Sequence, residues 1–300
     1  MILNTSHSTR LSSIVRAVKQ PGPTNSSTPT GRVAIEEGVE LEVADSGEGP
    51  PVLLLHGFPD SLTMWNGVTK QLVAAGHRVI AYDHRGFGAS SAPAGRRHYA
   101  IDRIVEDAVE VLGALGVREP VTVVGHDWGA FVSWALCLSR PELVGRHVAI
   151  SAGHPRALRT VSLEQVRKAF FVPGLLVVGI AERVLAARDF AVWRRVVATH
   201  PDLDRVTADL SRAGRLTAAL NWYRANAVTI ATRSWDACRV PTRGVFSTGD
   251  AHLVEEQMVR SELFMDAPWD YVSIDGAGHW VPLEQPERLA ALIASWATRP

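Results

Sequence analysis

Short, almost continuously apolar stretches alternate with segments of helical periodicity through the first half of this 300-residue sequence. The stretch 51–57, for example, reads PVLLLHG, and the stretch 121–125 reads VTVVG. Strands of this kind are buried on both faces, and helices between them imply a parallel sheet that is covered on both sides. We therefore expect strands at 39–43, 51–57, 77–83, 121–125 and 144–151, and helices at 101–116 and 130–138.

The second half changes character, because residues 156–235 read almost entirely as helix before strand patterns return. Strands are expected at 242–250 and 270–276, and a closing helix at 286–297. A helical insertion between strands of a parallel sheet indicates a lid over the carboxyl ends of the strands, where such sheets bind ligands. The predicted fold is α/β, with a mostly parallel central sheet flanked by helices. Its core comprises residues 33–155 and 236–300, and its all-helical lid comprises residues 156–235.

Residues 1–32 differ from the rest in composition. They are rich in Ser, Thr and Pro, and residues 1–35 contain basic side chains but no acidic one. We expect a disordered extension or an over-extended start codon rather than a transit peptide, and the composition leaves a targeting segment open. The apolar core of a secretory signal is missing from this stretch.

Charge and cysteine content exclude several classes of protein. Lys plus Arg and Asp plus Glu both number 31, and no basic block interrupts this balance, which argues against a nucleic-acid partner. The longest apolar run, 170–181, is shorter than the roughly 20 residues of a membrane-spanning helix. Cys137 and Cys238 lack the spacing of a disulfide framework or a metal site. We expect a cytoplasmic protein with no membrane partner, metal or cofactor, and a homodimer is compatible with the sequence.

The segment 121–136 combines a strand, a glycine-framed turn and a helix. Gly125 and Gly129 flank Asp127 at the spacing of a sharp strand-to-helix turn, which displays one side chain above the sheet. Asp127 would also stand at a helix N-terminus, where backbone N–H groups favour an anion. The alternative interpretation is an ordinary N-cap aspartate. We favour a nucleophile, because suitable partners follow downstream.

Asp250 and His279 follow Asp127 in the order nucleophile, acid, base that belongs to this architecture. Asp250 ends its strand, so its carboxylate should emerge at the same sheet edge as Asp127 and orient His279. His279 lies in the glycine-rich loop GAGHW, free to reach inward. Each residue alone could be a solvated turn residue or an ordinary loop histidine, but the ordered trio favours a catalytic triad. His56, which closes an earlier strand, is expected to brace its loop instead.

The motif HGFP at 56–59 supplies the remaining polar groups. An oxyanion hole in this architecture uses the backbone N–H after the nucleophile and one from the loop after an early strand, here Trp128 and Phe58. An aspartate is ionised at neutral pH and suits displacement at saturated carbon, which leaves an alkyl ester on Asp127. His279 would then activate the water that hydrolyses this ester. The substrate should therefore be an epoxide or an alkyl halide.

These two substrates need different help from the protein. An epoxide oxygen leaves as a strongly basic alkoxide and benefits from an acid, whereas a halide needs only N–H donors. Of the 4 tyrosines, Tyr223 alone falls in the predicted lid, within LNWYR. A phenol there that points towards Asp127 would be a suitable acid. Taken in isolation, a tyrosine packed on a helix face is the more common situation.

Six motifs together resemble the α/β-hydrolase superfamily and, within it, the epoxide hydrolases, over residues 33–298. They are HGFP (56–59), DHRGFGAS (83–90), GHDWG (125–129), NWYR (221–224), GD (249–250) and GHW (278–280), in this order. HGFP and GHW are shared across the superfamily, GHDWG narrows it to members with an aspartate nucleophile, and NWYR points to epoxide hydrolases. The resemblance implies an α/β-hydrolase fold and a small apolar epoxide as substrate. It also implies the following roles: Asp127 as nucleophile, Asp250 and His279 as the charge-relay pair, and Tyr223 as the ring-opening acid.

The sequence departs from the family pattern in the lid. Many epoxide hydrolases use two lid tyrosines, but the segment 163–183 contains none. Tyr223 then works alone, or His154 assists it, or the activity is altered. The predicted substrate-binding residues are His154, Phe170, Phe171 and Trp222, with Trp193 as further apolar lining.

Other interpretations stay open. Haloalkane dehalogenases resemble this sequence in GHDWG, where the Trp128 indole could hold a halide. In them an asparagine often serves as second halide donor where Phe58 stands here, and Trp222 could substitute for it. A fluoroacetate dehalogenase fits less well, because the turn carries Trp128 and Ala130 instead of arginines. A non-catalytic binding protein of this fold is a further alternative, against which the intact trio argues.

Overall fold

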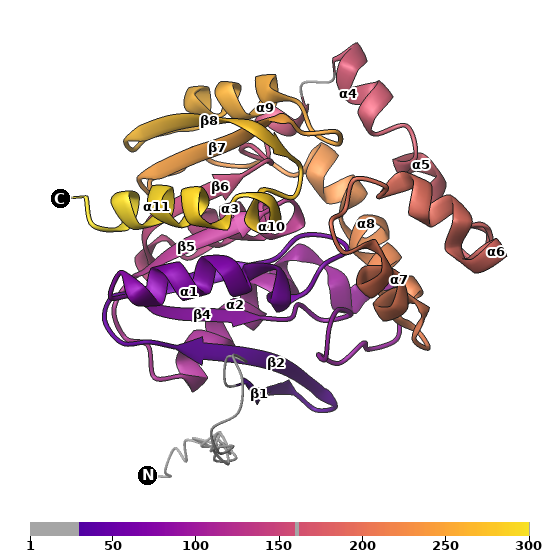
Figure 1. Cartoon of the computed structure of the whole chain (residues 1–300), viewed down its shortest axis with the longest axis horizontal. Helices are drawn as coiled ribbons and strands as arrows, with labels where there is room; N and C mark the ends of the chain where they lie inside the picture. The colour runs from indigo at the N-terminus through magenta and orange to yellow at the C-terminus, as the bar shows by residue number, and fades with distance from the viewer. Residues whose placement is uncertain (1–29, 160–161, 300) are drawn as a thin grey trace, which may run out of the picture.

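An eight-stranded sheet forms the centre of the protein in the computed structural model, which describes residues 30–159 and 162–299 (Figure 1). The strand order is β1-β2-β4-β3-β5-β6-β7-β8. Strands β3 to β8 are parallel, while β2 pairs antiparallel with both β1 and β4. The bounds are β1 Thr30–Glu36, β2 Val39–Ser46, β3 Pro51–Leu55, β4 Arg78–Tyr82, β5 Val121–His126, β6 Val144–Ile150, β7 Thr242–Gly249 and β8 Trp269–Gly278. The mostly parallel sheet predicted from the apolar runs is confirmed.

Strand β1 begins at Thr30, ahead of the domain start expected at residue 33, and forms a hairpin with β2. Its sequence TGRVAIE alternates exposed and half-buried side chains, as a strand at the sheet edge does, and has no continuous apolar run. The predicted boundary at residue 32 therefore falls inside the sheet. Residues 1–29, which carry the expectation of a disordered or targeting segment, lie outside the described residues.

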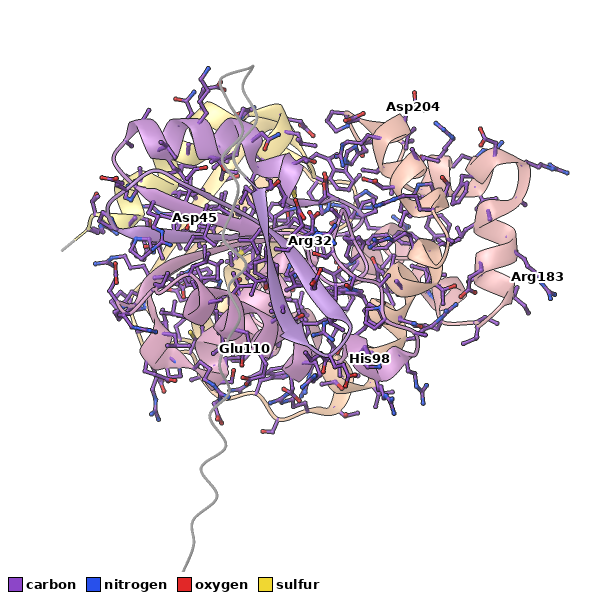
Figure 2. All side chains as sticks on the ribbon, turned by 90° about the horizontal axis from the view of Figure 1, so that it is seen from below. Arg32, Asp45, His98, Glu110, Arg183 and Asp204 are labelled. Atoms are coloured by element: carbon purple, nitrogen blue, oxygen red, sulfur yellow. The ribbon has the colours of Figure 1, made fainter. Side chains whose placement is uncertain are left out.

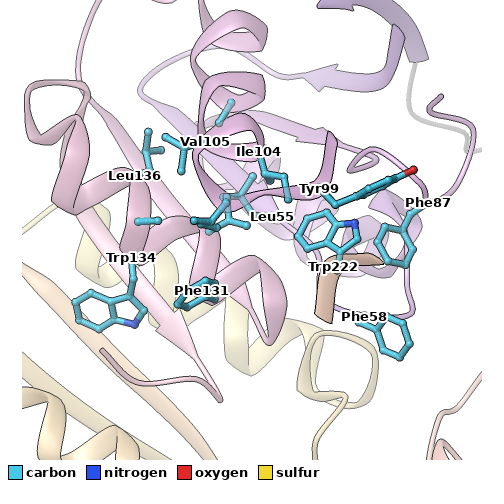
Figure 3. Packing of buried hydrophobic residues seen from close by; sticks show 14 of the residues in the cluster. Leu55, Phe58, Phe87, Tyr99, Ile104, Val105, Phe131, Trp134, Leu136 and Trp222 are labelled. Carbon is cyan, nitrogen blue, oxygen red and sulfur yellow. The ribbon is translucent and has the colours of Figure 1, made fainter. Parts of the chain in front are cut away.

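Helices cover both faces of the sheet, because successive strand residues point to opposite sides. Leu53 and Leu55 of β3 belong to the core cluster shared with α2 and α3, part of which Figure 3 shows. Val52 and Leu54 belong to the cluster shared with α1 and α11, which lie together on the other face (Figure 1). These helices, with two shorter ones near the C-terminus, are α1 Asn66–Ala74, α2 Ile101–Ala114, α3 Trp128–Ser139, α9 Glu255–Val259, α10 Val281–Glu284 and α11 Pro286–Ala297. Short 3₁₀ helices span Leu62–Trp65, Arg96–Tyr99, Pro141–Leu143, Ala157–Arg159 and Arg260–Phe264.

The lid consists of helices α4 to α8, inserted between β6 and β7 within the range 156–235 (Figure 1). The helices are α4 Leu163–Lys168, α5 Val172–Leu175, α6 Ile180–Val196, α7 Leu203–Ser211 and α8 Arg215–Thr232. Helix α6 departs from helical geometry at residues 187–190. Arg183 on α6 and Asp204 on α7 lie at the periphery of the lid (Figure 2). Among the helices of the described residues, none has both the length and the hydropathy needed to cross a bilayer.

Helix α8 is fixed to the core by buried hydrogen bonds. The indole Nε1–H of Trp222 donates to the carbonyl of Arg85 over 3.1 Å. The Asn226 side chain donates to the carbonyl of Tyr99 and accepts from the N–H of Ile101, both over 2.8 Å. Figure 3 shows the Trp222 ring next to Phe87, with Tyr99 above both. This lid helix is therefore held in a defined position relative to the carboxyl ends of the strands.

Candidate active site

The turn between β5 and α3 carries Asp127. This residue has φ 52° and ψ −117°, a backbone conformation that non-glycine residues rarely adopt. A Cβ atom on Gly125 would lie 2.2 Å from the carbonyl oxygen of Gly129, and one on Gly129 would lie 2.1 Å from that of Leu55. Both positions therefore need glycine, in keeping with the turn motif. Asp127 occupies the N-cap position of α3, but its side chain makes no capping hydrogen bond, so the N-cap interpretation does not hold.

The two carboxylate oxygens of Asp127 have different neighbours. The backbone N–H of Phe58 donates to Oδ1 over 2.9 Å, and the N–H of Trp128 also hydrogen-bonds this side chain. Oδ2 faces His279, whose Nε2 lies 3.8 Å away. Burial raises the pKa of Asp127 from its ordinary value, while His279 and the two N–H groups oppose the rise. Phe58 and Trp128 thus lie where the sequence predicts oxyanion donors.

His279 is joined to Asp250 by a buried hydrogen bond of 2.9 Å between Nδ1 and Oδ2. The other oxygen of Asp250 accepts the backbone N–H groups of His252 and Leu253 over 2.8 and 2.9 Å. Burial would raise the pKa of Asp250, but His279 and these N–H groups hold it far below its ordinary value. Burial would lower the pKa of His279, but the carboxylates of Asp250 and Asp127 raise it. The imidazole is therefore oriented with Nε2 towards Asp127.

Two further histidines brace the loops of the site. His126 donates from Nε2 to the carbonyl of His279 over 2.8 Å, and burial lowers its pKa to about 3. His56 donates from Nδ1 to the carbonyl of Gly57, and its Nε2 accepts the N–H of His84, each over 2.9 Å. Both ring nitrogens of His56 are therefore occupied, which is the bracing arrangement expected from the sequence.

Tyr223 on α8 lies beside Phe58 and Trp128, the two residues that flank the carboxylate of Asp127. Its ring packs edge-on against Phe58 and Trp128, with centroid separations of 5.2 and 5.0 Å. Burial, together with the charge of Asp127, raises the pKa of Tyr223 well above its ordinary value. The phenol therefore stays protonated at neutral pH and can act as a hydrogen-bond donor.

A cavity of about 170 Å³ contains the side chains of both Asp127 and Tyr223. Its further lining is mostly apolar, and includes Trp128, Phe131 and Phe171. Gln165 and His252 add polar groups that the sequence analysis did not single out. His252 follows Asp250 by two residues, so its position beside the triad is the one signal that could have indicated it. In the described part of the chain, no cluster of three His, Cys, Asp or Glu side chains could hold a metal ion.

Of the predicted pocket residues, Phe171 lines this cavity and His154 does not. The buried ring of His154 packs against Trp134 and Phe264, with centroids 5.1 and 5.3 Å apart. Burial lowers the pKa of His154 to about 4. The suggestion that His154 assists Tyr223 is therefore wrong, because the chain after β6 carries this histidine into the core.

Phe170, Trp222 and Trp193 also lie elsewhere than expected. Phe170 is 75% exposed and faces a second, larger cavity. Trp222 is buried, and its indole N–H is engaged by the carbonyl of Arg85. Trp193 is buried against Phe58. Neighbouring positions on a helix face different directions, and only the packing of the lid decides which side chains reach the cavity.

A buried network of polar side chains, which the sequence analysis missed, ties the loop of HGFP (56–59), the predicted oxyanion loop, to the lid. The carboxylate of Asp60 lies 3.0 Å from Nε2 of His200 and 2.7 Å from a guanidinium nitrogen of Arg205. The N–H of Ser61 donates to the same carboxylate over 2.8 Å. Asp60 follows HGFP directly, whereas His200 and Arg205 lie around the start of α7. The loop that carries Phe58 is thus held from the lid side as well as from the core.

Comparison with known proteins identifies the family to which this chain belongs. The family model described as alpha/beta hydrolase fold matches residues 50–236, which defines the class. The AB hydrolase superfamily protein YfhM of Bacillus subtilis is 32% identical, over 86% of this chain and 94% of that protein. Epoxide hydrolase A of Mycobacterium tuberculosis is 30% identical, over 90% of this chain and 98% of that protein.

Solved structures of epoxide hydrolases have the same fold as this chain. A structure from a study of novel epoxide hydrolases in metagenomes from hot environments has a TM-score of 0.79 and 26% identity, over 90% of this chain and 98% of its own. The chain therefore belongs to the alpha/beta hydrolase superfamily and, within it, to the epoxide hydrolase family. The resemblance noted in the sequence motifs is confirmed.

Proposed function

We propose that this protein hydrolyses small apolar epoxides to vicinal diols through an alkyl ester on Asp127. One observation carries the proposal: Asp127 and Tyr223 line the same small cavity, with His279 beside the carboxylate. A carboxylate opposite a protonated phenol suits an oxirane, whose carbon needs a nucleophile and whose oxygen needs a proton. The names of the similar proteins point to the same reaction.

In the first step, Oδ2 of Asp127 attacks an oxirane carbon and the carbon–oxygen bond of the ring breaks. Oδ1 already accepts the N–H of Phe58, so Oδ2 is the oxygen available for attack. Tyr223 donates its proton to the departing oxygen, which becomes the first hydroxyl group of the product. The result is a hydroxyalkyl ester of Asp127 and a tyrosinate.

In the second step, His279 takes a proton from water, and the hydroxide attacks Cγ of Asp127. The N–H groups of Phe58 and Trp128 stabilise the oxyanion that forms. The intermediate collapses by expelling the diol oxygen, which takes the proton from His279. The new carboxylic acid of Asp127 returns a proton to the tyrosinate, so the sum is epoxide plus water giving diol.

The haloalkane dehalogenase alternative requires two halide donors, Trp128 and Trp222, and the structure leaves only one of them available. The indole N–H of Trp222, the second halide donor in this alternative, already donates to the backbone carbonyl of Arg85. Of the two proposed donors, Trp128 alone lines the cavity with Asp127. An epoxide hydrolase needs no such donor pair, because the proton comes from Tyr223.

A panel of epoxides and chloroalkanes tests the proposal. Incubation with styrene oxide and 1,2-epoxybutane should yield diols, and incubation with 1-chlorobutane should release no chloride. Chloride release without diol formation would select the dehalogenase, and binding without turnover of either would select the binding protein. The cytoplasmic location and the homodimer expected from the sequence stay predictions.

A further inference from the structure

The outer half of the lid exposes a concentration of apolar surface. Of the 12 large apolar side chains that are exposed within the described residues, nine lie between residues 163 and 192, on and around α4, α5 and α6. Figure 1 shows these three helices at the outer edge of the molecule, beyond α7 and α8 as seen from the sheet. Proteins rarely gather exposed apolar side chains in one place unless that place binds a partner.

Part of this surface surrounds the larger cavity, which measures about 860 Å³. The exposed apolar residues that line it, here called the lid apolar face, are Phe170, Val177, Ile180, Val184 and Val192. The larger cavity adjoins the cavity of Asp127 at Phe171 and His252, which line both. A partner bound to the lid apolar face therefore lies next to the candidate active site.

Basic side chains accompany the lid apolar face. On α4 and α6, four exposed arginines make no side-chain hydrogen bond or ion pair with any described residue: Arg167, Arg183, Arg188 and Arg195. Arg167 and Arg195 line the same cavity as the lid apolar face, and Arg183 points outward from α6 (Figure 2).

Acidic side chains do not offset this charge. Glu164 and Glu182, two of the three acidic side chains on α4 to α6, have ion-pair partners within the protein. Asp189 is the third, and it has no ion pair with the described part of the chain. Four unpaired arginines therefore stand against one unpaired aspartate, and the uncompensated charge of this part of the lid is positive.

These two properties together indicate the chemistry of the partner. An anionic bilayer offers acyl chains to apolar side chains and phosphate groups to guanidinium groups, and proteins that lie on membranes bind through this combination. A second copy of the chain fits less well, because a symmetric contact through this face would bring the unpaired arginines of both copies together. The formal net charge of the whole chain is zero, so attraction to an anionic surface has to come from a local cluster of this kind.

We propose that the lid apolar face is a membrane-docking surface for anionic phospholipid bilayers. Its apolar side chains enter the region of the acyl chains, and Arg167 and Arg195 lie at the phosphate groups. The bilayer is contacted and not crossed, so the shortness of the apolar runs, from which the sequence predicts no membrane partner, does not bear on this contact. The inference goes beyond the proposed function and does not depend on it, because docking uses neither Asp127 nor Tyr223.

Vesicle flotation with the full chain tests the apolar part of the surface. We expect the protein to float with vesicles of equal parts phosphatidylcholine and phosphatidylglycerol, and to bind phosphatidylcholine vesicles about tenfold more weakly or less. Ile180→Glu should weaken binding to the anionic vesicles by about tenfold or more, because it removes an apolar side chain from the acyl region and adds a charge that the phosphates repel. Val228→Glu is the matched control. Both residues are β-branched and exposed on lid helices, by 59% for Ile180 and 71% for Val228, but Val228 lines neither cavity. The control should bind like the wild type.

A second pair of variants tests the basic part of the surface. Arg167→Gln/Arg195→Gln should lower binding to the anionic vesicles by about tenfold. Arg118→Gln/Arg239→Gln removes the same charge elsewhere and should leave binding unchanged. Arg118 and Arg239 are exposed and precede β5 and β7, so they lie at the edge of the sheet opposite the lid.

The outcomes separate the bilayer from a second copy. Weakened vesicle binding in Ile180→Glu and in Arg167→Gln/Arg195→Gln, with both controls like the wild type, supports the docking surface. Failure of the wild type to float, or equal binding by each variant and its control, would overturn it. A wild-type dimer in sedimentation velocity that Ile180→Glu converts to a monomer, without vesicle binding by either, would also overturn it and assign the face to a second copy. No epoxide is used in these measurements, so failure of the proposed reaction leaves this result unaffected.

Discussion

Nε2 of His279 lies 3.8 Å from Oδ2 of Asp127, beyond the distance of a hydrogen bond. The imidazole is instead anchored through Nδ1 to Asp250 over 2.9 Å. Oδ2 is thus free to bond to a substrate carbon, while Oδ1 is held by the N–H of Phe58. Formation of an ester would remove the charge of Asp127, which helps to keep the pKa of His279 raised. In the proposed mechanism, the ester bond to the substrate would therefore make His279 more available as a base.

Replacement of the base should trap the covalent intermediate. In His279→Gln, the first step needs only Asp127 and Tyr223, while the second step loses its base. We expect an adduct with the mass of one epoxide molecule after incubation with excess styrene oxide, detected by intact-mass spectrometry. The double variant Asp127→Asn/His279→Gln should show no adduct. An adduct of equal yield in both variants would place the alkylated group elsewhere, and absence of an adduct in His279→Gln would contradict the two-step scheme.

Tyr223→Phe should slow ring opening. A positioned general acid contributes about 10²- to 10⁴-fold, and the described lining of the small cavity contains no other phenol. We expect single-turnover ester formation to slow by at least 10²-fold, whereas hydrolysis of an ester that has already formed slows far less. Rapid-quench experiments on each step measure this difference. Equal slowing of both steps would show that Tyr223 shapes the cavity without donating a proton.

The pH dependence should follow His279. In the ester the charge of Asp127 is gone, but the carboxylate of Asp250, the larger of the two contributions, still raises the pKa of His279. The neutral imidazole is the base, so ester hydrolysis should be lost as pH falls through the pKa that His279 has in the ester. Burial lowers the pKa of the neighbouring His252 to about 4 and that of His126 to about 3, so neither titrates in the same range. We expect Asp250→Asn to lower the rate and to move the acidic limb to lower pH. A limb that stays in place in this variant would assign it to another group.

The pH profile of the other step, ring opening, should lack an alkaline limb near pH 10. Free tyrosine loses its proton at about that pH, but burial keeps Tyr223 protonated further into the alkaline range. Ring opening by the wild-type enzyme, measured in single turnovers between pH 8 and 10, should therefore stay constant. A decline centred below pH 10 would show that the phenol is more acidic than its surroundings indicate.

The network that links the oxyanion loop to the lid should support stability. Asp60→Ala leaves His200 without its buried partner and removes one of the three carboxylates around Arg205, and loss of such a hydrogen-bond partner typically costs about 1–3 kcal/mol. We expect a loss of about that size in the free energy of unfolding by urea. Asp204→Ala is the control, because Asp204 is paired with Arg194 but is 90% exposed, and such pairs contribute up to about 1 kcal/mol. Equal losses in the two variants would contradict the structural role of Asp60.

The turn that carries Asp127 could be predicted from the sequence, because its pattern lies within a few consecutive residues. A glycine on each side of Asp127 fits only a tight strand-to-helix turn, and the clash of an added Cβ atom with backbone at both positions shows why. The order of Asp127, Asp250 and His279 at strand ends was also informative, because the carboxyl ends of parallel strands meet at one edge of the sheet. The edge strand β1 was missed, because it is half-exposed and has no apolar run.

The lid shows the limit of such rules. Phe170 and Phe171 are adjacent and chemically identical, yet Phe171 lines both cavities, while Phe170 is 75% exposed and lines only the larger one. Trp222 and Tyr223 are likewise adjacent. Trp222 is buried, with its indole N–H bonded to the carbonyl of Arg85, while Tyr223 lines the cavity of Asp127. Phe170 and Phe171 lie in the turn between α4 and α5, where no periodic pattern applies, and in α8 helical periodicity states that neighbours face different ways but not which of them faces inward.

The sequence by itself therefore determined the alternation of strands and helices and the sharp turn that displays the Asp127 carboxylate, and it carries the prediction of a carboxylate nucleophile, because each depends on residues close together in the chain. Only the tertiary structure decided that Tyr223 and not His154 lines the cavity of Asp127, that Asp60 ties the predicted oxyanion loop to the lid, and that two cavities meet at Phe171 and His252. These features depend on contacts between segments that are distant in sequence. Such contacts are fixed by how the lid packs on the core, and no local pattern encodes them.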